Sequence, residues 1–533
     1  MNDKVRLFLL LVSGYVLLEL LSWIGYNDPM WSSLFFFIVV LAVAVLAWFR
    51  PGLAVVVVLG ELFVGSQGGY MLTVGPANVD GAILSLRMGL FLALFGPWLA
   101  RTALGLLSLR GAERRSNPDE IAAVPRIKSG VPRNDKGLGW YYVMKETKLL
   151  WPYVALLMVF AFGGLRGLLA GNGFGNVFFD ANGYAFFALF PAFMGGLRDL
   201  RARRLMWYVL AAAVTVSVAK ALAVMYFFSH RLYYVAANMY LWVRDTRVGE
   251  VTLTVADFHR VFFQSHLYVL VAIFTVFLFA ASAKSIRKPG FWIPFGLLVW
   301  GIIAMVLGLS RSFWFGGFIA ALTMIGLLIW TKAGKGLWGR MAIVAPASLV
   351  LAIGIIAGIY AFPFPTKTGD LSFMSMLSGR AFSLAGEAAA NSRWTLLKEM
   401  WPAGMEHPIL GSGLGTTVTY RTEDPRLLVD NPTGEYTTFA FEWGYHDLWV
   451  KFGVLGLLVY AWLIAVILTP YFVSLKMWKR ESGANRADAI VLIGIISGMV
   501  AMLATNVFSP YLNHPLGIGL LMAVAAIGYK RGD

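Results

Sequence analysis

Residues 391–460 begin NSRWTLLKEMWPAGMEHPILGSGLGTT and end EWGYHDLWVKFGVLGLLVY, and this stretch decides how the chain is organised. Its first part is polar and belongs to the longest segment after residue 150 that lipid could not cover. Its last part carries His446 into the start of an apolar run. Because binding and catalytic groups are often placed on loops held by a rigid scaffold, we expect the polar chemistry of this chain here.

The composition is that of a membrane protein. The 533 residues are 59% hydrophobic and 14% charged, with a mean hydropathy of +0.71. A soluble domain is nearer half apolar and a quarter charged. We therefore predict an all-α, polytopic bundle of transmembrane helices. Cysteine is absent, which excludes disulfides, thiolate nucleophiles and cysteine-ligated metals. Glu406 and His407 do not form an HExxH motif and no other metal-ligand spacing is evident, so we expect neither a metal nor a cofactor.

A membrane-spanning helix needs about 20 mainly apolar residues. Apolar runs predict about 12–14 spans, with 51–65 and 184–197 short enough to be re-entrant. The first run follows Lys4 and Arg6 without a small-residue cleavage site, as expected for an uncleaved anchor. The candidate spans are 7–25, 33–49, 51–65, 82–100, 149–170, 184–197, 205–227, 264–283, 291–309, 313–330, 342–362, 446–468, 489–505 and 512–528.

The basic residues set the predicted orientation. They gather in 101–148 and in the short loops 198–204, 284–288, 332–340 and 476–486, which span counting places on the side of the N-terminus. Cytoplasmic loops carry the excess of Lys and Arg, so we predict that both termini are cytoplasmic. This topology accounts for the net charge of +16 and pI of about 9.8 without a nucleic-acid partner. The predicted divisions are N-terminal spans 1–100, a basic cytoplasmic loop 101–148, central spans 149–362, an extracytoplasmic loop 363–445 and C-terminal spans 446–533.

Histidine is confined to the other predicted side, which receives 228–262, 310–312, 363–445 and 506–513. Histidine is the side chain that titrates near neutral pH, so its enrichment on one side points to chemistry there, although chance is the alternative. The histidines that map to this side or its membrane boundary are His230, His259, His266, His407, His446 and His514.

His446 has the most informative context, since it joins the polar loop to the apolar run 448–468. At that depth it could act as general base on a hydroxyl presented to a lipid-borne substrate. The alternative is an interfacial histidine that only hydrogen-bonds a carbonyl. Asp447 is its neighbour, but adjacent residues of a helix do not face each other, so we do not predict a dyad.

Several arginines are candidates for binding an anionic group on the same side. Arg311 separates two apolar runs, and Arg380 and Arg393 lie in the polar loop. Arg260 stands beside His259. A guanidinium suits a pyrophosphate because its fork of donors binds oxygens in pairs. The alternatives are snorkelling for Arg311 and simple solvation for the loop arginines.

Two further arginines lie inside apolar runs. Arg87 and Arg166 map to the exterior half of their spans, where they could mark a substrate path or could snorkel. The run Gly411-x-Gly413-x-Gly415 is not a dinucleotide or P-loop signature, since no strand precedes it and no Gly-Lys-Ser/Thr follows. It predicts a turn after Pro408.

Three features in order resemble the O-antigen ligase and polymerase family. They are the Ser-Arg pair ending at Arg311, Arg393 fourteen residues before the His407-Pro408 turn with its glycine run, and His446 opening a later span. The resemblance covers about 150 residues, with a weaker echo near Arg260. It implies a GT-C-like membrane enzyme that transfers a glycan, with inversion and without a metal, from an undecaprenyl-pyrophosphate carrier to a hydroxyl.

Carried over by position, the resemblance implies that Arg311 and Arg393 hold the pyrophosphate and that His446 is the base. Arg260 and Arg380 are further candidates for the pyrophosphate, and His266 and His407 are possible members of the site. The implied partners are the lipid-linked donor, a glycan or lipid A-core-like acceptor and the bilayer. The implied location is the bacterial cytoplasmic (inner) membrane, with the active site on its extracytoplasmic face.

The sequence leaves other functions open. A transporter or flippase for the same lipid would use basic residues along its path and would need no base. Within the transferases, a ligase, a polymerase and a protein O-oligosaccharyltransferase are not separated. Three departures from the family pattern leave the acceptor open: Asp447 follows the histidine, Leu397 stands where a Trp is common, and the chain has extra spans.

Overall fold

The structure is a computed structural model of the full chain. It describes residues 3–66, 72–74, 84–113, 139–253, 258–283, 285–366, 388–423, 428, 432–480 and 486–528.

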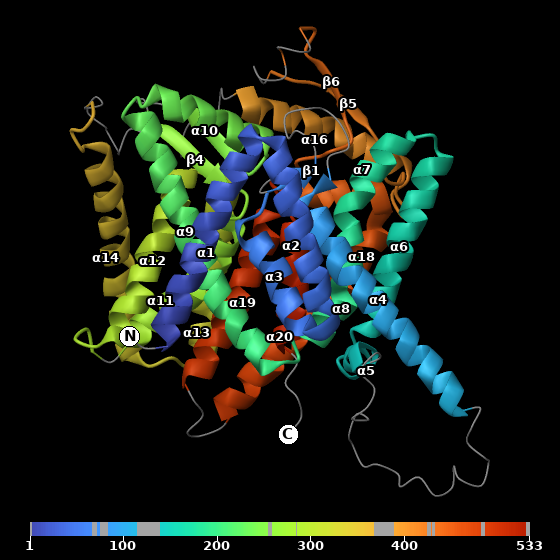
Figure 1. Ribbon diagram of the computed structural model, residues 1–533, viewed down its shortest axis with the longest axis horizontal. Helices are drawn as coiled ribbons and strands as arrows, with labels where there is room; N and C mark the ends of the chain where they lie inside the picture. Colours follow the sequence, from blue (N-terminus) through green and yellow to red (C-terminus); the bar gives the residue numbers. More distant parts are fainter. Residues whose placement is uncertain are drawn as a thin grey trace, which may run out of the picture.

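Helices dominate these residues and run side by side across the molecule (Figure 1). Eleven candidate spans in the described part of the chain are long and apolar enough to cross a membrane, and three shorter apolar helices run among them. The helices are α1 (Asp3–Asn27), α2 (Pro29–Phe49), α3 (Pro51–Val64), α4 (Leu86–Glu113), α5 (Gly139–Glu146), α6 (Leu150–Leu169), α7 (Phe174–Ala185), α8 (Phe190–Gly196), α9 (Leu200–Ser229), α10 (Tyr233–Asp245), α11 (His266–Ser282), α12 (Pro289–Gly308), α13 (Arg311–Trp330), α14 (Lys335–Tyr360), α16 (Ala388–Glu406), α18 (Gly444–Arg480), α19 (Arg486–Thr505) and α20 (Pro515–Gly528). The predicted all-α, polytopic membrane fold is confirmed.

Among the described residues, three two-stranded antiparallel sheets accompany the helices. The central one pairs Val251 with Val261 and leads directly into α11. The strands are β1 (Thr73–Val74), β2 (Leu84–Ser85), β3 (Gly249–Leu253), β4 (His259–Phe263), β5 (Val418–Arg421) and β6 (Glu435–Thr438).

The predicted spans match helices, with differences at their ends. The run predicted at 184–197 is the second half of a longer segment, Phe174–Gly196, made of α7, a 3-10 turn at Phe186–Leu189 and α8. Its hydropathy is the lowest of the eleven candidates because α7 contains Asn176, Asp180 and Asn182. Helices α4 and α18 continue well past their apolar runs, to Glu113 and Arg480. Part of the basic segment 101–148 is therefore helical; 114–138 lie outside the described residues.

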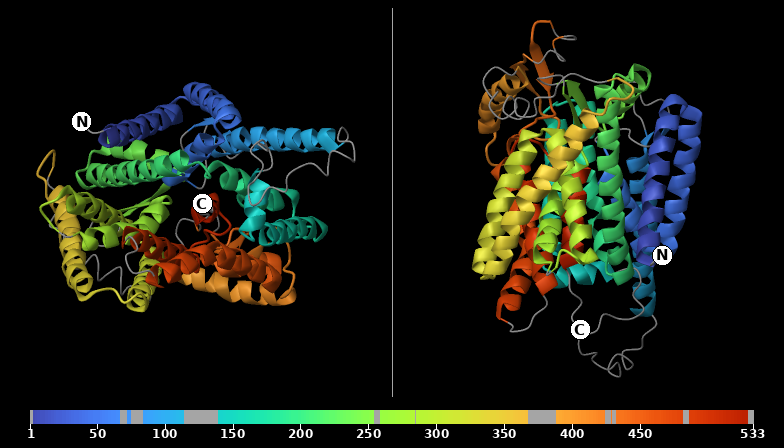
Figure 2. Two further views of the ribbon diagram at one scale, coloured as in Figure 1. Left: turned by 90° about the horizontal axis from the view of Figure 1, so that it is seen from below. Right: turned by 90° about the vertical axis from the view of Figure 1, so that its left-hand side faces the viewer.

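The centre of the bundle is formed by two short, buried helices, α20, which is apolar throughout, and α3, which is apolar except for Glu61. Every residue of α20 from Leu516 to Ala526 is buried, and α3 is buried from Val58 to Val64. Helix α20 packs on α3, α8 and α18. Seen from below, α1 and α2 lie along one edge and the orange and red C-terminal helices along the opposite edge (Figure 2). Segments far apart in the sequence thus share one core.

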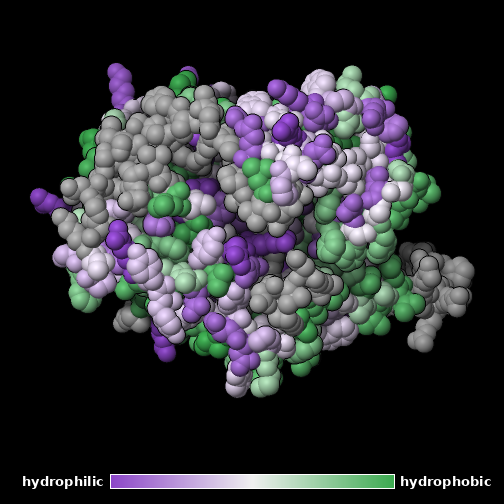
Figure 3. Space-filling view, turned by 90° about the horizontal axis from the view of Figure 1, so that it is seen from above, coloured by the Kyte–Doolittle hydropathy of each residue, from purple (hydrophilic) through white to green (hydrophobic). Residues whose placement is uncertain are grey.

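One end of the bundle carries α10, α16 and the β5–β6 hairpin, and we call it the α16 end (Figure 1). The start of α1 and the end of α20 lie at the opposite end. Hydrophilic residues gather toward the middle of the α16 end, with more hydrophobic ones at its edges (Figure 3). A small separate apolar core joins α16, β5 and the start of α18; its buried members are Leu396, Met400, Val418, Phe441, Trp443 and Val450.

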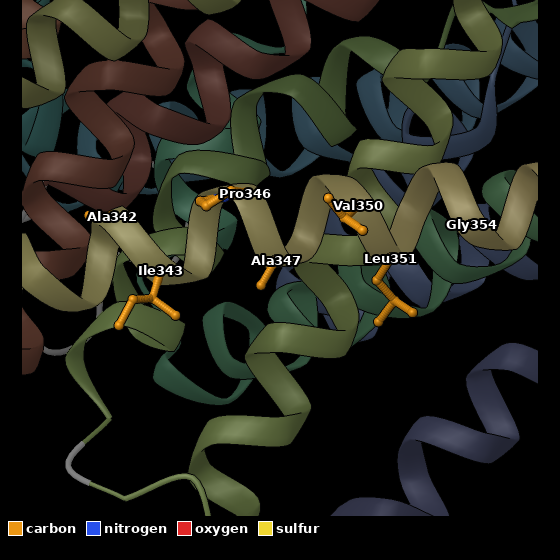
Figure 4. Close-up of a pocket in the computed structure, with 7 residues that line it drawn as sticks. All are labelled: Ala342, Ile343, Pro346, Ala347, Val350, Leu351 and Gly354. Atoms are coloured by element: carbon orange, nitrogen blue, oxygen red, sulfur yellow. The ribbon is translucent and has the colours of Figure 1, made fainter.

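Helix α14 stands at the edge of the bundle, and a shallow hollow of about 810 Å³ runs along it (Figure 4). All the residues that line this hollow come from α14, and none has a polar side chain that could orient a ligand; they are Ala342, Ile343, Pro346, Ala347, Val350, Leu351 and Gly354. Ile343 and Val350 are exposed, as expected for a face that meets lipid tails.

Candidate functional site

His446 lies in the first turn of α18, half-buried among three indole rings. Its ring centroid is 6.2 Å from that of Trp401, 6.1 Å from Trp443 and 6.3 Å from Trp449. Trp401 comes from α16, whereas the other two indoles come from the segment that begins α18. Packing between α16 and α18 therefore sets the orientation of the imidazole while leaving part of it accessible.

Arg393 lies near the start of α16, with its guanidinium half exposed and paired with the carboxylate of Glu442. Its backbone carbonyl accepts a hydrogen bond of 2.9 Å from Trp443 Nε1. Trp443 thus contacts both the backbone of Arg393 and the ring of His446. One indole thus links the backbone of Arg393 to the imidazole of His446.

Arg311 is the first residue of α13 and is half-buried. The neighbouring hydroxyl of Ser312 lies 3.0 Å from Ser509 Oγ, in the segment after α19. In the same segment the ring of Phe508 packs 5.3 Å from Trp443 and 5.3 Å from Phe315 of α13. A continuous set of contacts therefore joins the start of α13 to the indole that links Arg393 to His446.

Arg260, on β4, is engaged with neighbouring groups. Its Nε donates to the carbonyl of Gly308 at 2.7 Å, and its Nη1 lies 3.0 Å from Glu250 Oε2. Gly308 ends α12, and Leu309 then adopts a left-handed conformation with φ of +40°. Arg260 therefore braces the turn that presents Arg311. Arg380 lies outside the described residues.

His266 begins α11 and is fully buried, and its Nδ1 accepts from the backbone N–H of Phe263 at 3.4 Å. Its burial sets it apart from the accessible groups around His446. All six histidines lie at the α16 end: at the C-terminus of α9, on β4, at the start of α11, after α16, at the start of α18 and before α20.

His407 lines a cleft of about 500 Å³ between α6 and the loop after α16. Its side chain is exposed, and Arg166, in the last turn of α6, lines the same cleft. We call this hollow the α6 cleft; it is lined by Phe162, Leu165, Arg166, Leu169, Ala170, Asn172, Glu406, His407, Ser412 and Thr416.

The glycine-rich loop after His407 completes a broken helix. Helix α18 is interrupted at Gly453, where φ is +66° and ψ is −170°. The carbonyls of Val450 and Lys451 accept from the N–H groups of Ser412 and Gly413, at 2.7 and 3.1 Å. On the other side of the break, the N–H groups of residues 454 and 455 donate to the carbonyls of residues 408 and 409, at 2.8 and 3.1 Å. Residues 408–413 thus satisfy backbone groups that a break within a span would otherwise leave unpaired.

Close approach explains the glycines of this loop. Gly413 has φ of +93°, and a Cβ there would lie 2.4 Å from the backbone nitrogen of Gly167 on α6. The N–H of Leu414 donates to the carbonyl of Gly163, also on α6, at 2.9 Å. The predicted turn is therefore correct, and it is packed between α6 and α18.

Below the loop lies a buried ionic cluster that sequence reasoning missed. Lys451 Nζ is 2.7 Å from Asp180 Oδ1 and 2.5 Å from Asp447 Oδ1, and all three side chains are nearly inaccessible. Asp180 also accepts from the N–H of Gly415 at 2.9 Å, and Asp447 from Asn513 Nδ2 at 2.9 Å. The cluster ties α7, the glycine loop, α18 and the segment before α20 together. The available signal was an Asp and a Lys four residues apart on one face of a span.

Arg87 also has a partner that the sequence did not indicate. It forms a two-point ion pair with Glu61 of α3, with N–O distances of 2.7 and 3.0 Å. Pairing of this kind lets α3 and α4 keep two charges inside the bundle. Neither predicted interpretation of Arg87, a substrate path or snorkelling, included this ion pair.

No curated protein matches the chain. Residues 296–461 match the family model described as O-antigen ligase. The matched segment contains Arg311, Arg393, His407 and His446, together with the broken part of α18. It supports a multi-pass membrane glycosyltransferase of the O-antigen ligase type. The predicted resemblance to the O-antigen ligase and polymerase family is thereby confirmed, and the chain carries that family's domain over residues 296–461.

Proposed function

We propose that this protein transfers a glycan from an undecaprenyl-pyrophosphate carrier to a hydroxyl acceptor, at the indole-lined site of His446. The observation that carries the proposal is the contact of one side chain, Trp443, with both Arg393 and His446. An accessible imidazole that is linked through one indole to the backbone of an arginine is suited to deprotonating a hydroxyl next to an anionic leaving group.

In the proposed reaction the acceptor oxygen forms a bond to the anomeric carbon of the donor. The bond between that carbon and the phosphate oxygen breaks, and the pyrophosphate leaves with the electron pair. His446 takes the proton of the acceptor hydroxyl. Arg311 and Arg393 stabilise the charge that develops on the pyrophosphate. Because attack and departure occur on opposite sides of the carbon, the configuration inverts.

The ion pair of Arg393 with Glu442 fits this role. Both side chains are half exposed, so the pair is weak and a pyrophosphate can replace the carboxylate. Arg260 then acts as a positioning residue, because its hydrogen bond to Gly308 fixes the turn before Arg311. The acceptor is a glycan in a polymerase and a lipid A-core in a ligase, and both use the same step.

The test replaces His446 with Ala and with Gln in a strain that lacks the chromosomal copy. We expect loss of high-molecular-weight or acceptor-linked glycan on gels, while the lipid-linked donor accumulates. Tyr234→Ala, at an exposed position on α10, is the matched control and should leave the glycan unchanged. A transporter would keep moving its lipid in proteoliposomes after His446→Ala and would deliver it to a separate transferase. Full glycan production by both His446 variants would refute the proposal.

A further inference from the structure

The α6 cleft combines a hydrocarbon-facing wall with polar groups at its rim. Helix α6 lies at the edge of the bundle in Figure 1, and Leu165 and Leu169 are 57% and 80% exposed there. Phe162, one turn before Leu165, is exposed on the same wall. In a membrane these side chains meet lipid tails, so a hydrocarbon chain can enter the cleft sideways.

The rim holds ionisable groups that have no ion-pair partner among the residues that the structure describes. Arg166 is half-buried, and no described residue forms an ion pair with it. Glu406, the last residue of α16, and His407, which follows it, likewise have no ion-pair partner among those residues. A charge at a membrane boundary is costly unless it is paired or reaches water. An arginine presents several donors to one phosphate group, which makes a phosphate an effective partner for Arg166.

We propose that the α6 cleft binds a lipid that carries a phosphoryl group, with the phosphate on Arg166 and the chain against Leu165 and Leu169. Glu406 then accepts a hydrogen bond from a hydroxyl or an amine of the head group, and His407 donates one to a phosphate oxygen. A bilayer phospholipid and a polyprenyl phosphate share the phosphate and the hydrocarbon chain that the cleft would contact, but only the phospholipid has a head-group hydroxyl or amine for Glu406. The inference does not depend on transfer at His446.

The bound lipid contacts the loop that completes α18. His407 precedes Pro408, whose carbonyl accepts from Val454 N–H beyond the break and from Trp449 Nε1 at 3.2 Å. Trp449 in turn packs on the ring of His446. An occupied cleft therefore restrains the loop, and we expect a ligand there to raise the unfolding temperature of the whole protein.

The experiment uses the purified, full-length protein in detergent and measures lipid binding by native mass spectrometry. The probes are phosphatidylglycerol, undecaprenyl phosphate and, as a phosphate-free comparison, diacylglycerol. We expect binding of at least one phosphorylated lipid, and about tenfold weaker binding after Arg166→Gln, as for the loss of a charge-assisted hydrogen bond. Arg244→Gln, an exposed arginine on α10, is the matched control and should bind as the parent does.

Each outcome has one meaning. Preferential binding of phosphatidylglycerol assigns the cleft to bilayer lipid, and preferential binding of undecaprenyl phosphate assigns it to a carrier lipid. Leu169→Ser tests the contact with the hydrocarbon chain of the lipid, at a position exposed enough to leave the fold intact. This substitution should weaken the binding of both phosphorylated lipids. Equal binding of diacylglycerol, or unchanged binding of the phosphorylated lipids by Arg166→Gln, overturns the proposal. Because these readouts do not involve transfer, failure of the proposed function leaves them unaffected.

Discussion

Lys451 Nζ lies 2.7 Å from Asp180 Oδ1, so an ammonium on α18 is paired with a carboxylate on α7 that is 271 residues away in the chain. Asp447 holds the same ammonium from one turn earlier on α18. Burying a charge is costly unless it is paired and hydrogen-bonded, and this cluster meets both conditions through the N–H of Gly415 and the side chain of Asn513.

Replacing Lys451 with Met should destabilise the protein strongly, because it leaves two carboxylates buried without their cation. Losing one partner of a buried ion pair costs about 3–5 kcal/mol in soluble proteins. We expect a clear fall in the unfolding temperature in detergent. Adding Asp180→Asn and Asp447→Asn to Lys451→Met should recover part of the loss. An unfolding temperature for Lys451→Met equal to that of the parent would contradict the importance of this cluster.

Gly413→Ala should destabilise the protein more than Gly171→Ala. Both glycines have positive φ, +93° and +79°, so both substitutions strain the backbone. A Cβ at Gly413 also meets the backbone of Gly167 at 2.4 Å, whereas at Gly171 nothing lies within 4 Å. The difference between the two unfolding temperatures therefore measures the close approach of the loop to α6. Equal losses would mean that the loop is not packed there.

Arg311→Lys and Arg393→Lys should each lower glycan transfer about tenfold or more, because a compact ammonium does not reproduce the paired donors of a guanidinium. In the corresponding Ala variants the rate of glycan transfer should fall about 10²–10³-fold, which is the range for removing one group that stabilises a developing anion. Arg244→Lys is the control at the same end of the bundle. The measurement is the initial rate of product formation at matched protein levels. Full activity in both Lys variants would remove the two arginines from the proposed site.

Single cysteines test the predicted orientation in this cysteine-free chain. Thr368 belongs to the loop predicted to be extracytoplasmic, and Ser129 to the basic loop predicted to be cytoplasmic. We expect an impermeant thiol reagent to label intact cells through Thr368→Cys and not through Ser129→Cys. The reverse labelling pattern would mean that the protein has the opposite orientation in the membrane.

Chelation tests the predicted metal independence. If arginines stabilise the leaving group, transfer in purified membranes should continue in EDTA. Loss of product in EDTA that Mg²⁺ or Mn²⁺ restores would assign that role to a metal ion.

Apolar runs were enough to predict the membrane-spanning helices, because hydrocarbon demands about 20 apolar residues of any helix that crosses it. They were not enough for α7, since Asp180 lowers the hydropathy of that helix. Its charge is acceptable only because Lys451 meets it, and such a pairing is not visible in either local sequence.

The candidate site was predictable where the residue type itself carries the chemistry. A histidine and arginines at a membrane boundary point to an anionic substrate, and the family match covers Arg311, Arg393 and His446. The role of the glycine run was only half predictable. Its turn follows from Pro408 and the glycines, but its insertion into the break at Gly453 depends on hydrogen bonds between residues some 40 positions apart.

The pairing of α7 with α18 also sets an order of events on the ribosome. A chain is made from its N-terminus at about 5–20 residues per second, so the 271 residues between Asp180 and Lys451 take about 14–54 s to translate. During that interval the carboxylate has been synthesised and its ammonium has not. The polar segment around Asp180 can therefore reach its final place only after α18 has been made. The carboxylate of Asp180 therefore meets its buried ammonium partner only late in synthesis.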